Sequence, residues 1–431
     1  MTRMKESGID WIGQIPEEWE VTRIKNIVSI ERGASPRPID KFISDDDTGV
    51  NWIRIGDTYK GNKYITSTKL KITNRGKQFS RYIHPGTLIL SNSMSFGEPY
   101  ISSIYGCIHD GWLSLAPYKN ISKEYLYWLL LSDVCTSQFN LVSIGAVVEN
   151  LSVDKVGNTL VSMPYSLSEQ QKIADFLDKK TAQLDKAKAL LEEQIQKLKD
   201  YRASLIYETV TKGLDKTVPM KDSGIDWIGQ IPQGWGVIKF KHLGDVKQGL
   251  TYSPSDIVDK DEGILVLRSG NIQNGILDFN NNVYVKTKVA ESILLRKNDI
   301  LITARNGSSA LIGKNAIIDT DIKATFGAFM MVFRANKSLF AKFAFYLMNV
   351  SFNFYRTFFT TSTVNQLTAA IFNGIEVPLP SIYEQKKITD FLDGKTVQID
   401  KLIQIKNQQI ENINKQRQTL IYDYVTGKRR V

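Results

Sequence analysis

The sequence predicts an α/β (α+β) fold in which two globular domains are separated by two long helices. The helices are expected to form an antiparallel intramolecular coiled coil, and the whole chain to be a pseudo-twofold repeat. Two observations lead to this prediction. The opening words MKESGIDWIGQIP at 4–16 return as MKDSGIDWIGQIP at 220–232. A second pair, SEQQKIADFLDKKTAQLDK at 168–186 and YEQKKITDFLDGKTVQIDK at 383–401, returns at nearly the same offset and begins a heptad pattern.

The repeat has the order A–X–B–A′–Y–B′, in which A and B are shared and X and Y differ. The middles X (25–165) and Y (241–380) have nearly equal length but little similarity. A period this long lies outside the range of about 20–50 residues found in solenoid repeats. Either X and Y drifted while packing preserved A and B, or they do the same kind of task on different targets. The near-identity of A and B favours the second interpretation. The expected domains are 1–165, 166–215, 216–380 and 381–431.

Segments B (166–215) and B′ (381–431) are predicted to be helical throughout. The expected boundaries are a capping box at Ser168 and Gln171, a second N-cap at Thr181, and stops at Gly213 and Gly427.

An apolar seam runs along both helices for about three to four heptads. It consists of Leu184, Leu191, Ile195, Leu198 and Leu205 in B and of Ile399, Ile403, Ile410, Ile413 and Leu420 in B′. Lys188 and the equivalent pair Arg202 and Arg417 interrupt it, and polar seam residues set register at some cost in stability. One helix cannot bury such a stripe alone, so we expect B to pair with B′. The alternative is that each helix packs on its own domain.

Segment A contains Trp11, Pro16 and Trp19 together with short apolar stretches. We interpret it as a lead-in that packs against the helices, although it would also suit a binding motif.

The bulk composition narrows the class of protein. The chain has 431 residues, of which 42% are hydrophobic and 23% charged, with a formal net charge of +10. A basic surplus favours a polyanionic partner, most often nucleic acid, although ribosomal and membrane-surface proteins share it. Two cysteines, Cys107 and Cys135, indicate a reducing compartment. There is neither a signal-peptide core nor an apolar run of about 18 residues, so we expect a cytoplasmic protein without membrane spans.

X and Y both show short strands, polar turns and one aromatic helix. Arg reads guanine and Asn or Gln reads adenine in the major groove, while Lys and Ser suit phosphates. Polar turns are also common to all soluble domains, which is the plain alternative. The candidate DNA contacts are Arg32, Arg37, Arg54, Lys60, Asn62, Lys63, Ser91, Asn92 and Ser93 in X, and Lys247, Gln248, Arg268, Asn271, Gln273, Arg305, Asn306, Ser308, Thr363, Asn365 and Gln366 in Y.

Signals of catalysis are missing. His84, His109 and His242 stand apart, no Cys/His spacing suits zinc, and each histidine is expected to be satisfied or exposed. GSSALIGKN at 307–315 has five residues between its glycines, and Asn315 replaces the Ser or Thr of a P-loop. No Asn-Pro-Pro-Tyr or Asp-Pro-Pro-Tyr tetrapeptide is present. We therefore predict a chain without catalytic residues, metal or cofactor.

Three paired motifs resemble one family: SGIDWIGQIP followed by Trp, EQ-x-K-I-x-D-F-L-D-x-K-T-x-Q-[LI]-D, and the helix end LI-Y-[ED]-x-V-T. Across essentially its whole length the chain resembles the specificity subunit of type I restriction–modification systems. The resemblance implies two target-recognition domains that each read one half of a split, asymmetric DNA site. It also implies that the helices act as spacer and dock for two DNA methyltransferase subunits, which bind S-adenosylmethionine and methylate adenine. ATP- and magnesium-dependent restriction subunits would join them.

The length of the seam suits this implied spacer. From Thr181 to Thr211 is roughly 30 residues, or about 45 Å of helix. Half-sites one turn of B-DNA apart are separated by about 34–36 Å. Two alternatives from other classes are a two-lobed protein–protein adaptor without DNA binding and a stand-alone nuclease, the second disfavoured by the missing site.

Overall fold

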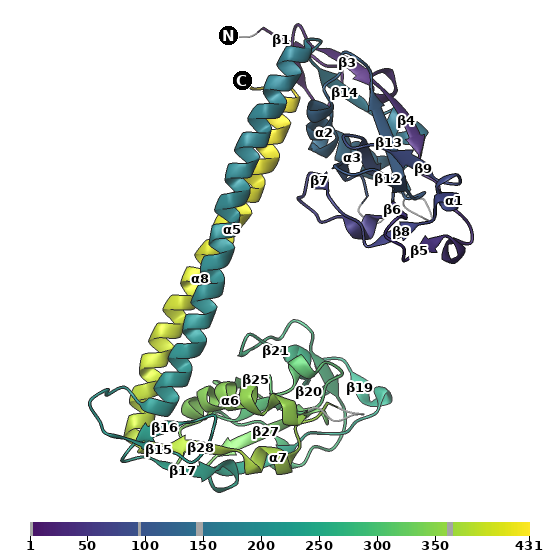
Figure 1. The fold of residues 1–431 in the computed structure, drawn as a ribbon. Helices are drawn as coiled ribbons and strands as arrows, with labels where there is room; N and C mark the ends of the chain where they lie inside the picture. Colours follow the sequence, from purple (N-terminus) through teal and green to yellow (C-terminus); the bar gives the residue numbers. More distant parts are fainter. Residues whose placement is uncertain (1–2, 94–95, 144–149, 360–364) are drawn as a thin grey trace. The chain divides into compact units, whose positions relative to one another are not determined.

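The computed structural model forms two compact units and describes residues 3–93, 96–143, 150–359 and 365–431 (Figure 1). Unit 1 contains Met1–Glu192 and Asn407–Val431, and unit 2 contains Glu193–Lys406. Each unit holds one lobe of mixed sheets and part of each long helix. These helices are α5 (Leu167–Lys212) and α8 (Ile382–Val425).

Two sheets form the lobe of unit 1, with strand orders β4-β13-β10-β11-β7 and β5-β8-β6-β12-β9. Most neighbours are antiparallel, but β11 pairs with β7 and β12 with β6 in parallel. The strands are β4 Val28–Arg32, β5 Ile43–Ser44, β6 Val50–Ile53, β7 Tyr64–Ile65, β8 Leu70–Ile72, β9 Arg81–Ile83, β10 Leu88–Ser91, β11 Pro99–Ser102, β12 Gly106–Ile108 and β13 Trp112–Pro117. The helices are α1 Asn74–Lys77, α2 Lys123–Leu131, α3 Asp133–Ser143 and α4 Val153–Gly157.

The lobe of unit 2 repeats this plan with strand orders β18-β27-β24-β25 and β19-β23-β20-β26. A small hairpin, β21-β22, is added. The strands are β18 Gly244–Gln248, β19 Ile257–Val258, β20 Ile264–Leu267, β21 Ile272–Gln273, β22 Ile276–Leu277, β23 Val283–Val285, β24 Ile300–Thr303, β25 Asn315–Ile317, β26 Ala324–Phe326 and β27 Met330–Ala335. The helices are α6 Ala341–Tyr355 and α7 Ala369–Gly374.

The central strands are apolar on both faces, because each lies between two packed layers. β10 reads LILS and β24 reads ILIT, and every residue of both strands is buried. A strand covered on both faces needs a continuous apolar run instead of an alternating one. The aromatic helices predicted in X and Y are α2 and α6, which supply large side chains such as Tyr125 and Phe343 to these cores.

Segments A and A′ form matching hairpins that lead into the lobes. β1 (Met4–Glu6) pairs with β2 (Gln14–Pro16), and β15 (Met220–Asp222) pairs with β16 (Gln230–Pro232) in the same register. β3 (Glu20–Arg23) then pairs with β14 (Leu160–Met163), as β17 (Gly236–Lys239) does with β28 (Glu376–Leu379).

The lead-in packs against the helices, as the sequence predicts. In unit 1 Trp19 is fully buried and its Nε1 donates to Glu169 Oε1 of α5 at 3.3 Å. The hydroxyl of Tyr422, in the last turn of α8, donates to the carbonyl of Trp11 at 3.1 Å. In unit 2 Trp235 Nε1 donates to Glu384 Oε2 of α8 at 3.0 Å in the same way.

The predicted helix stops are confirmed, but the predicted starts are wrong. α5 and α8 are followed by Gly213 and Gly427, whose φ angles of +72° and +73° end helices without a Cβ penalty. Ser166, not Ser168, accepts a hydrogen bond from a first-turn amide, Glu169 N, at 3.3 Å. α5 runs without interruption through Thr181, whose hydroxyl donates to the Leu177 carbonyl at 2.7 Å. A threonine hydroxyl can bond back along its own helix, so it caps nothing here.

All ten predicted seam residues are buried or half-buried, whereas most of the other residues between 182 and 204 are exposed. In unit 1 Arg417 Nε of α8 lies 3.5 Å from Asp185 Oδ1 of α5. In unit 2 Arg202 Nε of α5 lies 3.2 Å from Asp400 Oδ1 of α8. The two arginines that interrupt the seam thus pair across it, whereas Lys188 Nζ lies 3.9 Å from Glu192 Oε1 of its own helix.

Each unit has a second contact between the helices. The Phe176 ring packs against that of Tyr424 in unit 1, and Lys406 Nζ donates to Gln194 Oε1 at 2.6 Å in unit 2. In each unit the α8 residue number falls as the α5 residue number rises, so the helices pair antiparallel there (Figure 1).

Within the described ranges, no helix combines the length and the apolar character needed to cross a bilayer. Both cysteines are free and buried.

Candidate nucleic-acid interface

A crossing of two chain segments builds the candidate site of unit 1. The loop that follows β4 passes over the turn that follows β12. Gly33 lies so close to this turn that a Cβ there would fall 2.0 Å from the carbonyl oxygen of His109. Only glycine permits such an approach between two backbones. The crossing places the loop 33–41 beside the end of β6.

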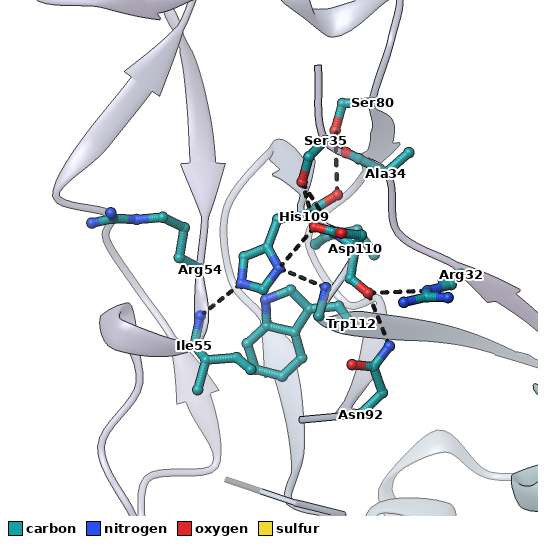
Figure 2. A network of polar contacts seen from close by, with 12 residues as sticks. Arg32, Ala34, Ser35, Arg54, Ile55, Ser80, Asn92, His109, Asp110 and Trp112 are labelled. Carbon is teal, nitrogen blue, oxygen red and sulfur yellow. Dashed lines mark hydrogen bonds and ion pairs between the residues drawn. The ribbon is translucent and has the colours of Figure 1, made fainter. Parts of the chain in front are cut away.

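Asp110 organises three of the predicted DNA contacts, Arg32, Arg37 and Asn92, of which Figure 2 shows Arg32 and Asn92. Its carboxylate accepts hydrogen bonds from Ser35 Oγ at 2.5 Å and from Arg37 Nη2 at 3.2 Å. Its carbonyl accepts from Arg32 Nε at 3.1 Å and from Asn92 Nδ2 at 2.9 Å. The Ser35 hydroxyl, more than the nearby cations, lowers the pKa of the Asp110 carboxyl. The sequence gives no sign of Asp110, because its partners are 18 to 78 residues away along the chain.

His109 is half-buried beside Asp110, and both of its ring nitrogens face backbone amides, so the expectation of a satisfied histidine is met at one nitrogen only. The amide of Gly111 points at Nδ1 from 2.6 Å and that of Ile55 at Nε2 from 3.2 Å. Burial lowers the pKa of His109 against the opposing effect of the Asp110 carboxylate, and the neighbouring Arg54 adds a smaller lowering. A neutral imidazole has one bare nitrogen, so only one amide donates to it at a time. The arrangement suits an uncharged ring that shapes the site.

A cavity of about 840 Å³ opens beside this network. Its lining includes Ser35, Arg37, Leu70, Trp52, Arg54 and His109. Two arginines and one carboxylate, Asp40, thus lie around an otherwise mainly apolar lining, and the arginines suit a base edge or a phosphate.

Other candidates of unit 1 lie elsewhere. Lys60 and Asn62 are exposed on the turn before β7. Lys63 is directed inward: its Nζ lies 2.6 Å from Asp178 Oδ1 of α5 and 5.0 Å from the centre of the Tyr127 ring. Ser91 is fully buried in β10, and Ser93 is half-buried just after it. Asn92 is only 1% exposed and its Nδ2 is bonded to the Asp110 carbonyl. We therefore assign Lys63, Ser91 and Asn92 to the framework, as a correction to their prediction as contacts.

Unit 2 has a larger cavity of about 1250 Å³ at the matching place. Arg268, Ser269, Arg305, Asn306, Phe329 and Asn365 are among its lining residues. Arg305 Nη2 donates to Gln366 Oε1 at 2.7 Å, and its guanidinium lies 5.7 Å from the centre of the exposed Phe329 ring. Sequence reasoning missed Phe329, because an isolated aromatic residue in a turn carries no pattern.

The remaining described candidates of unit 2 do not line this cavity. Lys247 and Gln248 end β18, Gln273 lies in the β21–β22 hairpin, and Ser308 is exposed in the turn after Asn306. Asn271 is only 1% exposed, and its Nδ2 donates to the Asp278 carbonyl at 2.9 Å, so we assign it to the framework. Thr363 lies outside the described residues.

A buried glutamine joins each lobe to its helix. In unit 1 Gln170 Oε1 accepts from the amide of Ser122 at 2.8 Å, and its Nε2 donates to the Pro164 carbonyl at 2.9 Å. In unit 2 Gln385 Oε1 accepts from the amide of Phe340 at 2.8 Å, and its Nε2 donates to the Pro380 carbonyl at 3.0 Å. The repeated Glu-Gln pair is therefore a structural joint.

We expect Gln170→Leu or Gln385→Leu to lower the free energy of unfolding by about 2 kcal/mol. Leucine fills the space but leaves a buried amide and a buried carbonyl without partners, each of which costs roughly 1–3 kcal/mol. Denaturant titration measures the loss. Gln196→Leu is the control, because Gln196 is exposed and its Nε2 donates to Asp200 Oδ1 of the same helix at 2.8 Å. Equal effects at positions 170 and 196 would contradict the assignment of the joint.

Within the described ranges, no group of three or more His, Cys, Asp or Glu side chains is arranged to hold a metal ion.

Comparison with known proteins agrees with the fold. The family model for the type I restriction modification DNA specificity domain matches residues 16–199 and 232–415. The specificity subunit of the type I restriction enzyme MjaVIII of Methanocaldococcus jannaschii is 23% identical over 97% of this chain and 94% of its own length. The EcoKI specificity subunit of Escherichia coli K12 is 31% identical over 46% of this chain, a match that spans only 44% of that relative.

Two solved structures share the architecture. One comes from work on complex assembly and conformational transition of the type I R-M system, with a TM-score of 0.78 and 16% identity over 96% of this chain and 99% of that chain. The other is the HsdS subunit from Thermoanaerobacter tengcongensis, with a TM-score of 0.54 and 16% identity over 96% and 98%. With two matched copies that together cover most of its length, the chain belongs to the family of type I restriction modification DNA specificity domains.

Proposed function

We propose that the chain is the DNA-recognition subunit of a type I restriction–modification complex, in which each lobe reads one half of a bipartite, asymmetric site. One observation supports this most directly. The glutamine that joins each lobe to its helix is repeated together with its backbone hydrogen bonds, as Gln170 and Gln385 illustrate, whereas the arginine-containing cavities of the two lobes carry different side chains. Two domains that recognise different DNA sequences need the same attachment to the helices but different side chains in their cavities.

In this proposal the chain does no chemistry itself. Two methyltransferase subunits dock on the helices, bind S-adenosylmethionine and methylate adenine. Restriction subunits that use ATP and magnesium complete the complex. Membership of the family and the likeness to a chain from a type I R-M assembly support these partners. Two free, buried thiols suit a reducing compartment, and we propose the cytoplasm.

The test is to co-express the chain with the methyltransferase subunit of its own system and to sequence the host DNA for methylated adenines. We expect methylation in one bipartite motif with unlike halves. Methylation without such a motif, or none from an assembled complex, would defeat the proposal.

Salt dependence separates this function from a protein–protein adaptor. A DNA-binding complex releases counterions, so its affinity for duplex DNA should fall steeply and linearly on a log–log plot as salt rises. An adaptor that never binds DNA would show no such affinity at any salt concentration.

A further inference from the structure

The two cavities are built on one backbone frame, although X and Y differ in sequence. In unit 1 the last residue of β6, Ile53, pairs in parallel with Ile108 of β12. In unit 2 the last residue of β20, Leu267, pairs in parallel with Phe326 of β26. Each of these strand pairs ends at the edge of its cavity.

The hydrogen bonds of the crossing are also the same. The amide of Ala34 donates to the Ile108 carbonyl at 3.2 Å, and the amide of Leu250 donates to the Phe326 carbonyl at 2.7 Å. The close approach of a glycine to the backbone of the crossed turn is also present in both units. A Cβ on Gly249 would fall 2.0 Å from the carbonyl oxygen of Gly327, as one on Gly33 would from that of His109. The two crossings are therefore structurally equivalent.

The residue that follows the paired strand is an arginine in both units. Arg54 follows β6 and Arg268 follows β20. Each begins a 3-10 turn with the same closed ring of hydrogen bonds. The amide of Arg54 donates to Asp57 Oδ2 and that of Arg268 to Asn271 Oδ1, both at 2.9 Å, while the amides of Asp57 and Asn271 donate back to the arginine carbonyls at 3.0 and 2.9 Å. This turn fixes the backbone from which each guanidinium extends.

Both arginine side chains line their cavities and keep donors available. The Nε of Arg54 is buried and lies 3.9 Å from Asp57 Oδ2, but the side chain as a whole is 37% exposed and its two Nη groups make no hydrogen bond to the described residues. Arg268 is exposed, and its Nη2 donates to the Asn281 carbonyl at 3.2 Å. A guanidinium has five N–H groups, so each arginine keeps a pair of N–H donors that can bond two acceptors of a base.

The surroundings of the two arginines differ in kind. Around Arg54 the crossing carries His109, Asp110 and the Asp110-bound Arg37. Around Arg268 the equivalent turn is Gly327, Ala328 and Phe329. The arginine is thus present in both cavities, whereas the side chains around it differ.

We propose that Arg54 and Arg268 are equivalent specificity-determining residues, each of which reads a guanine in the major groove of its own half-site. This inference rests on the proposed function and narrows it to one side chain in each lobe. The guanidinium fork matches O6 and N7 of guanine, which no other base presents as two acceptors. The unlike neighbours then read the other base pairs of each half.

The experiment uses the full chain co-expressed with its methyltransferase subunit, carrying Arg54→Ala, Arg54→Lys, Arg268→Ala or Arg268→Lys. Host genomic DNA is sequenced for methylated adenines. We expect each alanine variant to lose discrimination, by roughly 10- to 100-fold, at one G·C pair of one half-site. The other half should stay unchanged, and the two arginines should affect opposite halves. Lysine keeps the charge but not the fork, so the lysine variants should also relax that position.

Arg75→Ala in unit 1 and Arg296→Ala in unit 2 are matched controls, because both arginines are exposed and line neither cavity. The unaffected half-site reports that each variant complex is assembled. An unchanged motif, evenly reduced methylation without a relaxed position, or loss of all methylation from a co-purified complex would overturn the inference. So would a wild-type motif with no G·C pair in one half. A wild-type complex without any bipartite motif would instead defeat the proposed function.

Discussion

Replacing residues 25–165 by the corresponding middle of another member of the family should change one half of the recognised motif completely and leave the other half unchanged. The exchange removes the whole cavity of unit 1, including the loop 33–41 and Arg54, but nothing that lines the cavity of unit 2. The helices α5 and α8 are untouched, so the number of base pairs between the halves should also stay the same. Sequencing of methylated adenines in a host that expresses the exchanged chain measures both results.

The donor segment must contain the side chains that contact the helices. Ser122, Tyr125 and Trp128 of the exchanged part contact the helices: Ser122 donates to Gln170, Tyr125 to the Val425 carbonyl at 3.2 Å, and Trp128 to Asp178 at 2.9 Å. A donor that lacks these groups leaves polar atoms without partners at the joint. Such a donor should fail through instability, which is visible as loss of the complex.

The reciprocal exchange of 241–380 is the matched control, because it should change only the half that the first exchange leaves intact. If either exchange altered both halves, recognition would be shared between the lobes. If the original motif persisted, recognition would lie outside the exchanged segments.

The repeated parts of the fold were predictable because they are nearly identical in sequence. Trp19 and Trp235, Gln170 and Gln385, and the glycines that end both helices occur at nearly one offset, and a heptad seam reports a helix pair directly. The helix starts were less predictable, since Ser166, Ser168 and Thr181 all suit an N-cap. Only the packing of the first turn selects one of them.

The cavities were not predictable, because their equivalence is hidden by loops of different length. The first motif repeats at an offset of 216 (220 − 4), but Arg268 follows Arg54 by 214. Met330 pairs with the last residue of β24 as Trp112 pairs with the last residue of β10, and these two positions differ by 218. Each loop shifts the register, so no single offset aligns X with Y. The equivalent residues of X and Y are identified by the pairing of the backbone strands and not by the pattern of side chains.

Asp299→Ala should destabilise unit 2 by about 3–5 kcal/mol, a large share of the roughly 5–15 kcal/mol typical of a domain. The Asp299 side chain is 1% exposed and accepts two bonds of 2.7 Å from Arg334. It also accepts from the amide of Arg296 at 2.9 Å. This partnership raises the pKa of Arg334 above its usual range. Alanine would leave a guanidinium that is 22% exposed without its counterion. Hydrogen exchange at the amides of β24 and β27 is the measurement, because it reports unit 2 by itself.

Unit 1 provides the control, since it makes the same turn without an ion pair. Thr87 is the equivalent of Asp299, because the amide of His84 donates to its hydroxyl at 3.3 Å as the amide of Arg296 donates to Asp299. Ala116 is the equivalent of Arg334, because both follow the residue that pairs with the first residue of the central strand. The double variant Asp299→Thr with Arg334→Ala should therefore recover much of the stability lost in Asp299→Ala, because no uncompensated charge remains. If the double variant were no more stable than the single one, the loss would come from the turn and not from the stranded arginine. If Asp299→Ala cost less than about 1 kcal/mol, the ion pair would contribute no more than an exposed one does.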